Sequence, residues 1–121
     1  ENYFPGLGLR VELTIFSFMD KMCEAYKGGF WEYFKLSNGG LFMIPRMPQD
    51  KLTIQWDGND YEGEMSPEAA GICATMMAIS HLSFAVPPGS EIGETLAQRA
   101  ADLWEFINEH PEGASIFAML D

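Results

Sequence analysis

The longest stretch of the chain without Asp, Glu, Lys or Arg runs from Ala69 to Ser90, and it constrains the fold more than any other feature. A helix of this polarity either crosses a membrane or lies inside the protein. Gly71 and His81 lower its hydrophobicity, and Pro87 ends it before it reaches about 20 apolar residues. We therefore predict a buried central helix and no membrane contact.

The residues before this stretch define where the central helix begins. Ser66 supplies an N-cap hydroxyl, and Pro67 suits the first helical position, where no backbone N–H is needed. Glu68 adds negative charge at the positive end of the helix dipole. Because the helix is apolar on nearly all sides as far as Phe84, we expect it to lie between a sheet and another helix.

Strand and turn signals before the central helix predict two hairpins. Residues 30–36 are rich in aromatics and lead to an Asn-Gly pair that suits a type I′ turn, so residues 41–44 return as the partner strand. Residues 52–56 alternate apolar and polar side chains, and residues 61–65 can pair with them across a polar turn.

Amphipathic patterns predict three further helices. Apolar residues at helical spacing indicate a helix over 9–26, capped by the glycines at 28–29. Residues 91–109 carry an apolar stripe, and residues 112–120 form a short helix after a proline. The order predicts one α+β domain over residues 1–121. An antiparallel sheet of about four strands follows the N-terminal helix, and the central, amphipathic and C-terminal helices pack on it.

The charge balance limits the classes of partner. Eighteen acidic residues against seven basic ones give a formal net charge of -11, which repels duplex DNA and anionic membrane surfaces. We therefore expect no direct nucleic-acid binding, and a basic protein partner, a cation or simple solubility remain as explanations. Cys23 and Cys73 lie in apolar helical patterns without a CxxC neighbour, which favours free thiols in the cytoplasm over a disulfide.

Candidate catalytic and metal-binding residues do not combine into a recognisable site. Cys73 and His81 lie about 12 Å apart along a helix, and Ser80 points away from His81, so a nucleophile and a base do not meet. His81 and His110 lack further ligands at zinc spacing. The carboxylates over 57–64 lack the spacing of a calcium loop, and the glycines form no phosphate-binding motif. We predict no enzyme, no cofactor and no metal.

Two acidic surfaces are candidate partner-binding sites. Asp60, Glu62 and Glu64 would project from one face of a strand. The second surface follows three- and four-residue steps along the amphipathic helix. It consists of Glu91, Glu94, Asp102, Glu105 and Glu109. A solvated outer face explains both, and recognition of a basic protein patch is the sharper alternative. A full DNA mimic is disfavoured, because duplex DNA of the same length carries about sixteen phosphates.

Several segments resemble those of a known family. They are GGFWEYFKLSNGG (28–40), YEGEMS (61–66), AAGICAT followed by SHL (69–82) and HPEGASIFAMLD (110–121). Together they span nearly the whole chain in order, and they are similar to segments of antirestriction proteins of the ArdB/KlcA kind. The chain differs from the family's pattern in that it begins close to its first helix.

The resemblance implies a binding protein carried on plasmids, prophages or genomic islands. It implies relief of type I restriction of incoming DNA by non-catalytic inhibition, with no cofactor. The type I restriction enzyme complex would be its direct or indirect partner, and we expect a monomer or a weak homodimer. The alternative function is a small acidic adaptor or ligand-binding domain, or a weak hydrolase, that uses the face of Asp60, Glu62 and Glu64.

The aromatic segment over 30–34 adds two candidates for partner contact. Alternate side chains of a strand point to opposite faces. Trp31 and Tyr33 would contact a partner if one face of the strand is free, whereas both faces can instead lie in the core.

Overall fold

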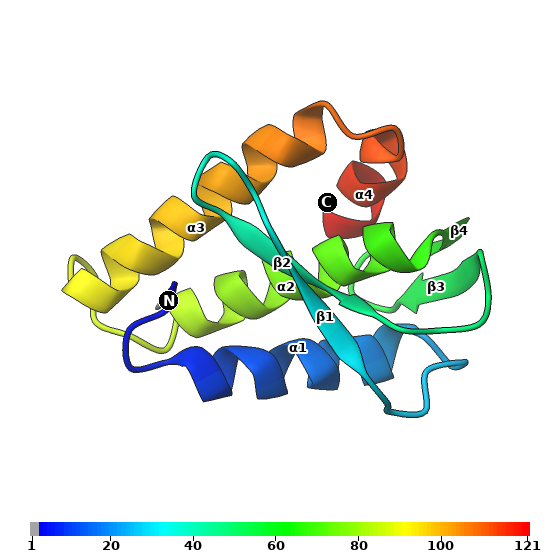
Figure 1. The fold of residues 1–121 in the computed structure, drawn as a ribbon, viewed down its shortest axis with the longest axis horizontal. Coiled ribbons are helices and arrows are strands. Elements are labelled where there is room, and N and C mark those ends of the chain that lie inside the picture. The colour runs from blue at the N-terminus through cyan, green and yellow to red at the C-terminus, as the bar shows by residue number, and fades with distance from the viewer. Residues whose placement is uncertain (1–2) are drawn as a thin grey trace.

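The computed structural model describes residues 3–121 as four helices and four strands in the predicted order (Figure 1). The elements are α1 (Gly8–Met22), β1 (Trp31–Lys35), β2 (Leu41–Pro45), β3 (Leu52–Trp56), β4 (Tyr61–Met65), α2 (Pro67–Ser83), α3 (Glu91–Asn108) and α4 (Gly113–Leu120). Helix α2 lies in the middle, with α1 on one side, α3 on the other, and the β1–β2 hairpin crossing it (Figure 1). The α+β class and the element order are confirmed.

The four strands form two antiparallel sheets within residues 3–121, β1 with β2 and β3 with β4. The hairpins are as predicted, but they do not join into the single sheet that we expected. Helix α2 lies against the outer edge of β2 instead, where the Met43 N–H donates to Thr75 Oγ1 at 3.1 Å. A Cβ atom on Gly71 would lie 2.0 Å from the Met43 carbonyl oxygen, so glycine permits this close approach.

Helix α2 is the buried centre that its uncharged sequence predicts. Every residue from Ala69 to Met76 is buried. The predicted start is confirmed, because Ser66 Oγ accepts a hydrogen bond from the Ala69 N–H at 3.1 Å and Pro67 lies in the first turn. The last turn is only partly in the core, because Leu82 is buried whereas Ser80 and His81 are exposed.

Helix α1 ends earlier than its apolar pattern predicts. Cys23 follows it with an extended backbone, at φ −136° and ψ 107°. Tyr26 is buried, and its hydroxyl accepts a hydrogen bond from Trp31 Nε1 at 2.9 Å. This contact requires the chain to turn back before β1, so the glycines at 28–29 lie in the connecting loop with positive φ and do not cap the helix.

The two C-terminal helices complete the core on the far side of α2. Ser90 caps α3, because its hydroxyl accepts a hydrogen bond from the Gly93 N–H at 3.1 Å. Leu103 and Ile107 of α3 are fully buried, as its apolar stripe predicts. The short helix α4 buries Ile116 and contacts both α2 and β4.

Candidate functional site

The acidic residues predicted on β4 are only partly brought together. Glu62 and Glu64 are exposed and share one face of the strand, opposite Gln55 and Thr53 of β3. Asp60 is also exposed, but it lies in the turn before β4 with a left-handed φ of 58°. Because it is outside the strand, it does not extend the row of carboxylates that we predicted.

The acidic stripe predicted on α3 is interrupted at its centre. Its other four members, Glu91, Glu94, Glu105 and Glu109, are exposed. Asp102 is only 8% exposed, and its carboxylate accepts hydrogen bonds from Arg99 Nη1 at 3.0 Å and from Gln98 Nε2 at 2.8 Å. The expectation that Asp102 belongs to an accessible stripe is therefore wrong: its charge is used inside the protein.

The residues that bury Asp102 form the tip of the β1–β2 hairpin, residues 36–40. Arg99 Nη1 donates to the Gly39 carbonyl oxygen at 2.6 Å. Asn38 Nδ2 donates both to the Asp102 carbonyl oxygen and to Glu105 Oε1, each at 2.8 Å. The hairpin tip is thus fastened to the middle of α3, and one of the exposed glutamates is held in place by it.

The aromatic strand β1 has one buried and several exposed rings. Trp31 is 8% exposed, since it donates to Tyr26 and packs 5.2 Å from the Phe16 ring. It therefore belongs to the core and is not a candidate for partner contact in this conformation. Tyr33 is 50% exposed and Phe34 is 45% exposed, so the alternative in which both strand faces lie in the core is also wrong.

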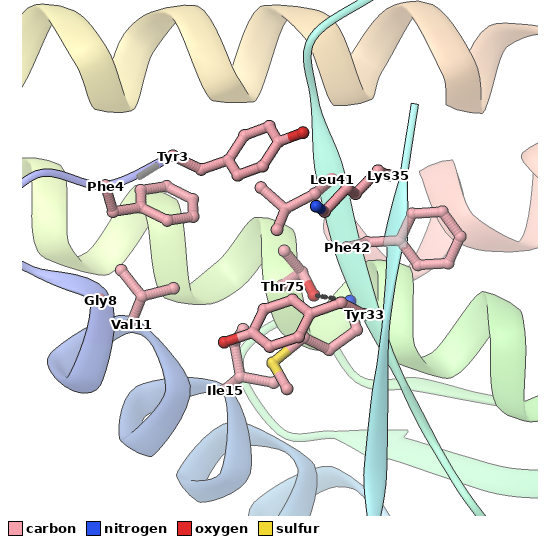
Figure 2. A pocket seen from close by; sticks show the side chains of 11 residues that line it. Tyr3, Phe4, Gly8, Val11, Ile15, Tyr33, Lys35, Leu41, Phe42 and Thr75 are labelled. Atoms are coloured by element: carbon pink, nitrogen blue, oxygen red, sulfur yellow. Dashed lines mark hydrogen bonds between the residues drawn. The ribbon is translucent and has the colours of Figure 1, made fainter. Parts of the chain in front are cut away.

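A cavity of about 350 Å³ lies between α1, the β1–β2 hairpin, α2 and the N-terminal residues, and it was not predicted (Figure 2). Its walls are formed mainly by apolar and aromatic side chains, and the lining residues also carry three hydroxyl groups and one ammonium group. The lining residues are Tyr3, Phe4, Gly8, Val11, Ile15, Tyr33, Lys35, Leu41, Phe42, Met43 and Thr75. Such a cavity suits an apolar group with a polar end. None of the three carboxylates Asp60, Glu62 and Glu64 lines it.

Polar side chains gather where the loop between α3 and α4 meets the start of α2. Ser66 donates to Glu112 from both its hydroxyl, at 2.5 Å, and its backbone N–H, at 2.9 Å. His110 Nε2 lies 2.6 Å from Glu68 Oε2, and His110 Nδ1 accepts from the Glu112 N–H at 2.9 Å. Burial raises the pKa of Glu112, but the hydrogen bonds from Ser66 and the charge of Lys51 outweigh it, so the pKa is lowered overall.

This polar cluster holds helices together and contains no serine–histidine pair. Ser66 Oγ donates to the Glu112 carboxylate, and the two ring nitrogens of His110 contact Glu68 and the Glu112 N–H. Burial, with the nearby charge of Glu112, raises the pKa of the Cys73 thiol to about 12. This thiol therefore stays protonated near neutral pH.

The part of the chain that the structure describes contains no group of three or more His, Cys, Asp or Glu side chains placed to hold a metal ion. In the same part, no helix has both the length and the apolar character needed to cross a membrane. The polar cluster around Ser66 was not predicted from the sequence, because its members come from segments far apart in the chain.

Comparison with known proteins decides the family. The family model for antirestriction proteins matches residues 24–121. The chain belongs to the antirestriction protein family. Antirestriction protein KlcA of Escherichia coli is 42% identical over 113 residues, which cover 93% of this chain and 76% of that protein. A second KlcA of Escherichia coli is 37% identical over 121 residues, covering 99% of this chain and 84% of that protein.

The antirestriction fold is shared as well. A solved structure superposes with a TM-score of 0.88 at 37% identity, covering 98% of this chain and 83% of that one. It belongs to the KlcA and ArdB proteins, which show a novel fold and antirestriction activity against type I DNA restriction systems in vivo but not in vitro.

The segments that resemble antirestriction proteins make packing contacts in this structure. Asn38 and Gly39 of LSNGG fasten the hairpin tip to α3. Gly71 of AAGICAT lets α2 touch β2. Ser66 of YEGEMS and Glu112 of HPEG join α2 to the start of α4. These segments therefore have clear structural roles.

Proposed function

We propose that this antirestriction protein relieves type I restriction of incoming DNA by non-catalytic inhibition of the restriction-modification system. One observation carries the proposal: the fold matches the KlcA and ArdB proteins, which have this activity in vivo, over almost the whole chain. A single domain of residues 1–121 would act in the cytoplasm as a monomer or a weak homodimer.

The arrangement of polar groups supports inhibition by binding. The Ser66 hydroxyl and the His110 ring are engaged in contacts between helices, and the Cys73 thiol is buried and protonated. A protein that acts without a covalent step needs instead an exposed surface complementary to its partner. Exposed carboxylates and aromatic rings provide such a surface. We propose as partner contacts Asp60, Glu62, Glu64, Glu91, Glu94, Glu105, Glu109 and Tyr33.

The net charge of -11 favours a basic protein partner over nucleic acid. The KlcA and ArdB proteins act in vivo but not in vitro. This supports one of two arrangements. Either the protein contacts the restriction complex directly but only under cellular conditions, or another cellular component mediates the contact.

The proposal is tested by plating unmodified phage on a host with an active type I system that expresses the protein. Plating should rise relative to the same host without the protein, and unchanged plating with soluble protein present would remove the proposal. Two variants test catalysis. Ser66→Gly removes the hydroxyl at little cost to the helix cap, and Cys73→Ala removes the thiol. Both should keep restriction relief, whereas loss of relief in a folded variant would indicate a catalytic role.

A second candidate function, a ligand-binding domain, is favoured by the cavity beside α1 (Figure 2). The ligand would be a small apolar molecule with one polar end, and the carboxylates of β4 would take no part. Ligand-detected NMR with short-chain and aromatic carboxylates tests this candidate. The substitution Val11→Phe should fill the cavity and abolish any binding, and binding that survives it would lie elsewhere.

A further inference from the structure

We propose that a cleft between the tip of the β1–β2 hairpin and the C-terminal half of α3 binds an arginine side chain of the protein partner. The proposal rests on the proposed function and gives the chemistry of its partner. The cleft has a volume of about 610 Å³. Its lining includes Phe34, Asn38, Glu105, Phe106 and Glu109.

A cluster of three aromatic rings forms the floor of the cleft. The ring centroids of Phe34 and Phe42 are 5.1 Å apart, those of Phe42 and Phe106 are 5.5 Å apart, and those of Phe34 and Phe106 are 6.5 Å apart. Phe42 is fully buried, so it supports both neighbours from below, and Phe34 remains 45% exposed. The face of an aromatic ring carries partial negative charge and attracts cations. The exposed part of the Phe34 ring therefore offers a surface that can attract a cation.

Two carboxylates lie at the rim of the same cleft. Glu105 and Glu109 are both exposed and stand one helical turn apart, about 6 Å along the axis. Asn38 Nδ2 donates to Glu105 Oε1 at 2.8 Å, which orients that carboxylate toward the hairpin tip. A carboxylate can accept about four hydrogen bonds, so this one retains capacity for a guest.

The basic groups nearest the cleft are directed elsewhere. Lys35 also lines the cleft, but its ammonium group lies 5.8 Å from the Tyr3 ring centroid, and its side chain leaves β1 on the face opposite to Phe34. The Arg99 guanidinium donates to Gly39 and Asp102 below the hairpin tip. His110 contacts Glu68 at 2.6 Å. The carboxylates of the rim thus dominate the local charge.

An arginine fits this site better than a lysine. Its planar guanidinium can stack on the exposed Phe34 ring and donate two parallel hydrogen bonds to a carboxylate. The lysine ammonium is a strongly hydrated point charge without a planar face. A basic partner protein would present such a side chain, in keeping with the net charge of -11.

The binding test uses NMR of the isotope-labelled whole chain with N-acetyl-arginine amide as the probe. We expect saturable shifts at the backbone amides of Asn38, Glu105 and Phe106, and several-fold weaker binding of N-acetyl-lysine amide. The double variant Glu105→Gln/Glu109→Gln should weaken arginine binding about tenfold. Its glutamine at position 105 keeps an oxygen that can accept from Asn38, so the hairpin tip stays in place.

The matched control is Asp20→Asn/Glu24→Gln, which removes the same amount of charge from two exposed positions outside the cleft and outside the proposed partner contacts. It should leave arginine binding unchanged. Equal loss in both double variants, equal binding of the two probes, or the absence of localised shifts would each overturn the proposal. The exposed ring is tested with Phe34→Leu, which should weaken arginine binding several-fold while a thermal melt checks the fold.

Phage plating separates this proposal from the proposed function. Loss of restriction relief in Glu105→Gln/Glu109→Gln, with relief retained in Asp20→Asn/Glu24→Gln, would support the arginine cleft. Full restriction relief by both double variants would overturn the role of the cleft in inhibition, and it would leave the proposed function intact. Failure of the unsubstituted protein to relieve restriction would overturn the proposed function, and the NMR titration would still decide whether the cleft binds arginine.

Discussion

Arg99 donates from Nη1 to Asp102 Oδ2 at 3.0 Å, and both side chains lie beneath the tip of the β1–β2 hairpin. The same guanidinium nitrogen reaches the Gly39 carbonyl oxygen at 2.6 Å, and Arg99 Nε donates to the Tyr3 carbonyl oxygen at 3.3 Å. One side chain therefore joins α3, the hairpin and the N-terminal residues. This explains why a carboxylate with 10% side-chain exposure remains satisfied.

Arg99→Ala should lower the free energy of unfolding by about 2 kcal/mol, because it removes one of the two donors to the Asp102 carboxylate and the side-chain donor to two carbonyl groups. Urea denaturation followed by circular dichroism measures the change. The control is Arg46→Ala, since the Arg46 ion pair with Glu32 is exposed, with side-chain exposures of 60% and 47%. It should cost less than about 0.5 kcal/mol. Equal costs for the two variants would contradict a structural role for Arg99.

Gly71→Ala should lower the free energy of unfolding by at least about 2 kcal/mol. The added Cβ would lie 2.0 Å from the Met43 carbonyl oxygen, and both groups belong to regular backbone that cannot move easily. Gly8→Ala at the start of α1 is the control, because a Cβ there has no heavy atom within 4 Å. Thermal melts measure both variants, and Gly8→Ala should be neutral or slightly stabilising. A tolerated Gly71→Ala would mean that α2 and β2 are farther apart.

The stability of the protein should fall in acid partly through Glu112. Its pKa in the folded protein is lowered from the ordinary value of 4.5. The stabilisation by its carboxylate is therefore fully present above pH 4.5 and is lost as the pH falls through the lower, folded-state pKa. Glu112→Gln should show a smaller loss of unfolding free energy between pH 6 and pH 3 than the unsubstituted protein, as measured by urea titration. Glu94→Gln, on the exposed surface, should keep the full dependence.

Both cysteines should resist thiol reagents in the folded protein. Cys23 and Cys73 are buried free thiols, each 1% exposed or less. In addition, burial raises the pKa of Cys73 to about 12, which leaves little reactive thiolate at pH 8. Ellman's reagent should therefore react with both cysteines only after urea is added. Rapid labelling of folded protein at pH 8 would show that the structure opens locally around Cys23 or Cys73.

Local sequence signals predicted the elements well, but they could not predict contacts between distant elements. Ser66 and Pro67 located the start of α2, because capping depends on neighbouring residues alone. The separation of the two hairpins depends on a contact between Met43 and Thr75, which no local pattern indicates. A strand whose edge is covered by a helix can have the same sequence pattern as a strand whose edge pairs with another strand.

The same limit applies to the candidate site. Helical periodicity correctly placed Glu105 and Glu109 on an exposed surface of α3. It placed Asp102 there too, since periodicity does not reveal that a hairpin tip covers that position. Two nearby residues were local signs that Asp102 has a partner: Arg99, three residues earlier, and Gln98, four residues earlier. Phe34 and Phe106 were missed because their pairing requires the hairpin and the helix to meet.

The close approach of the hairpin tip to α3 also has an evolutionary consequence. A Cβ atom on Gly40 would lie 2.8 Å from the Cβ of Asp102, closer than two such atoms can come. Positions 40 and 102 should therefore covary among homologues. A homologue with a side chain at position 40 should have glycine at position 102, or its hairpin tip should meet α3 in a different register.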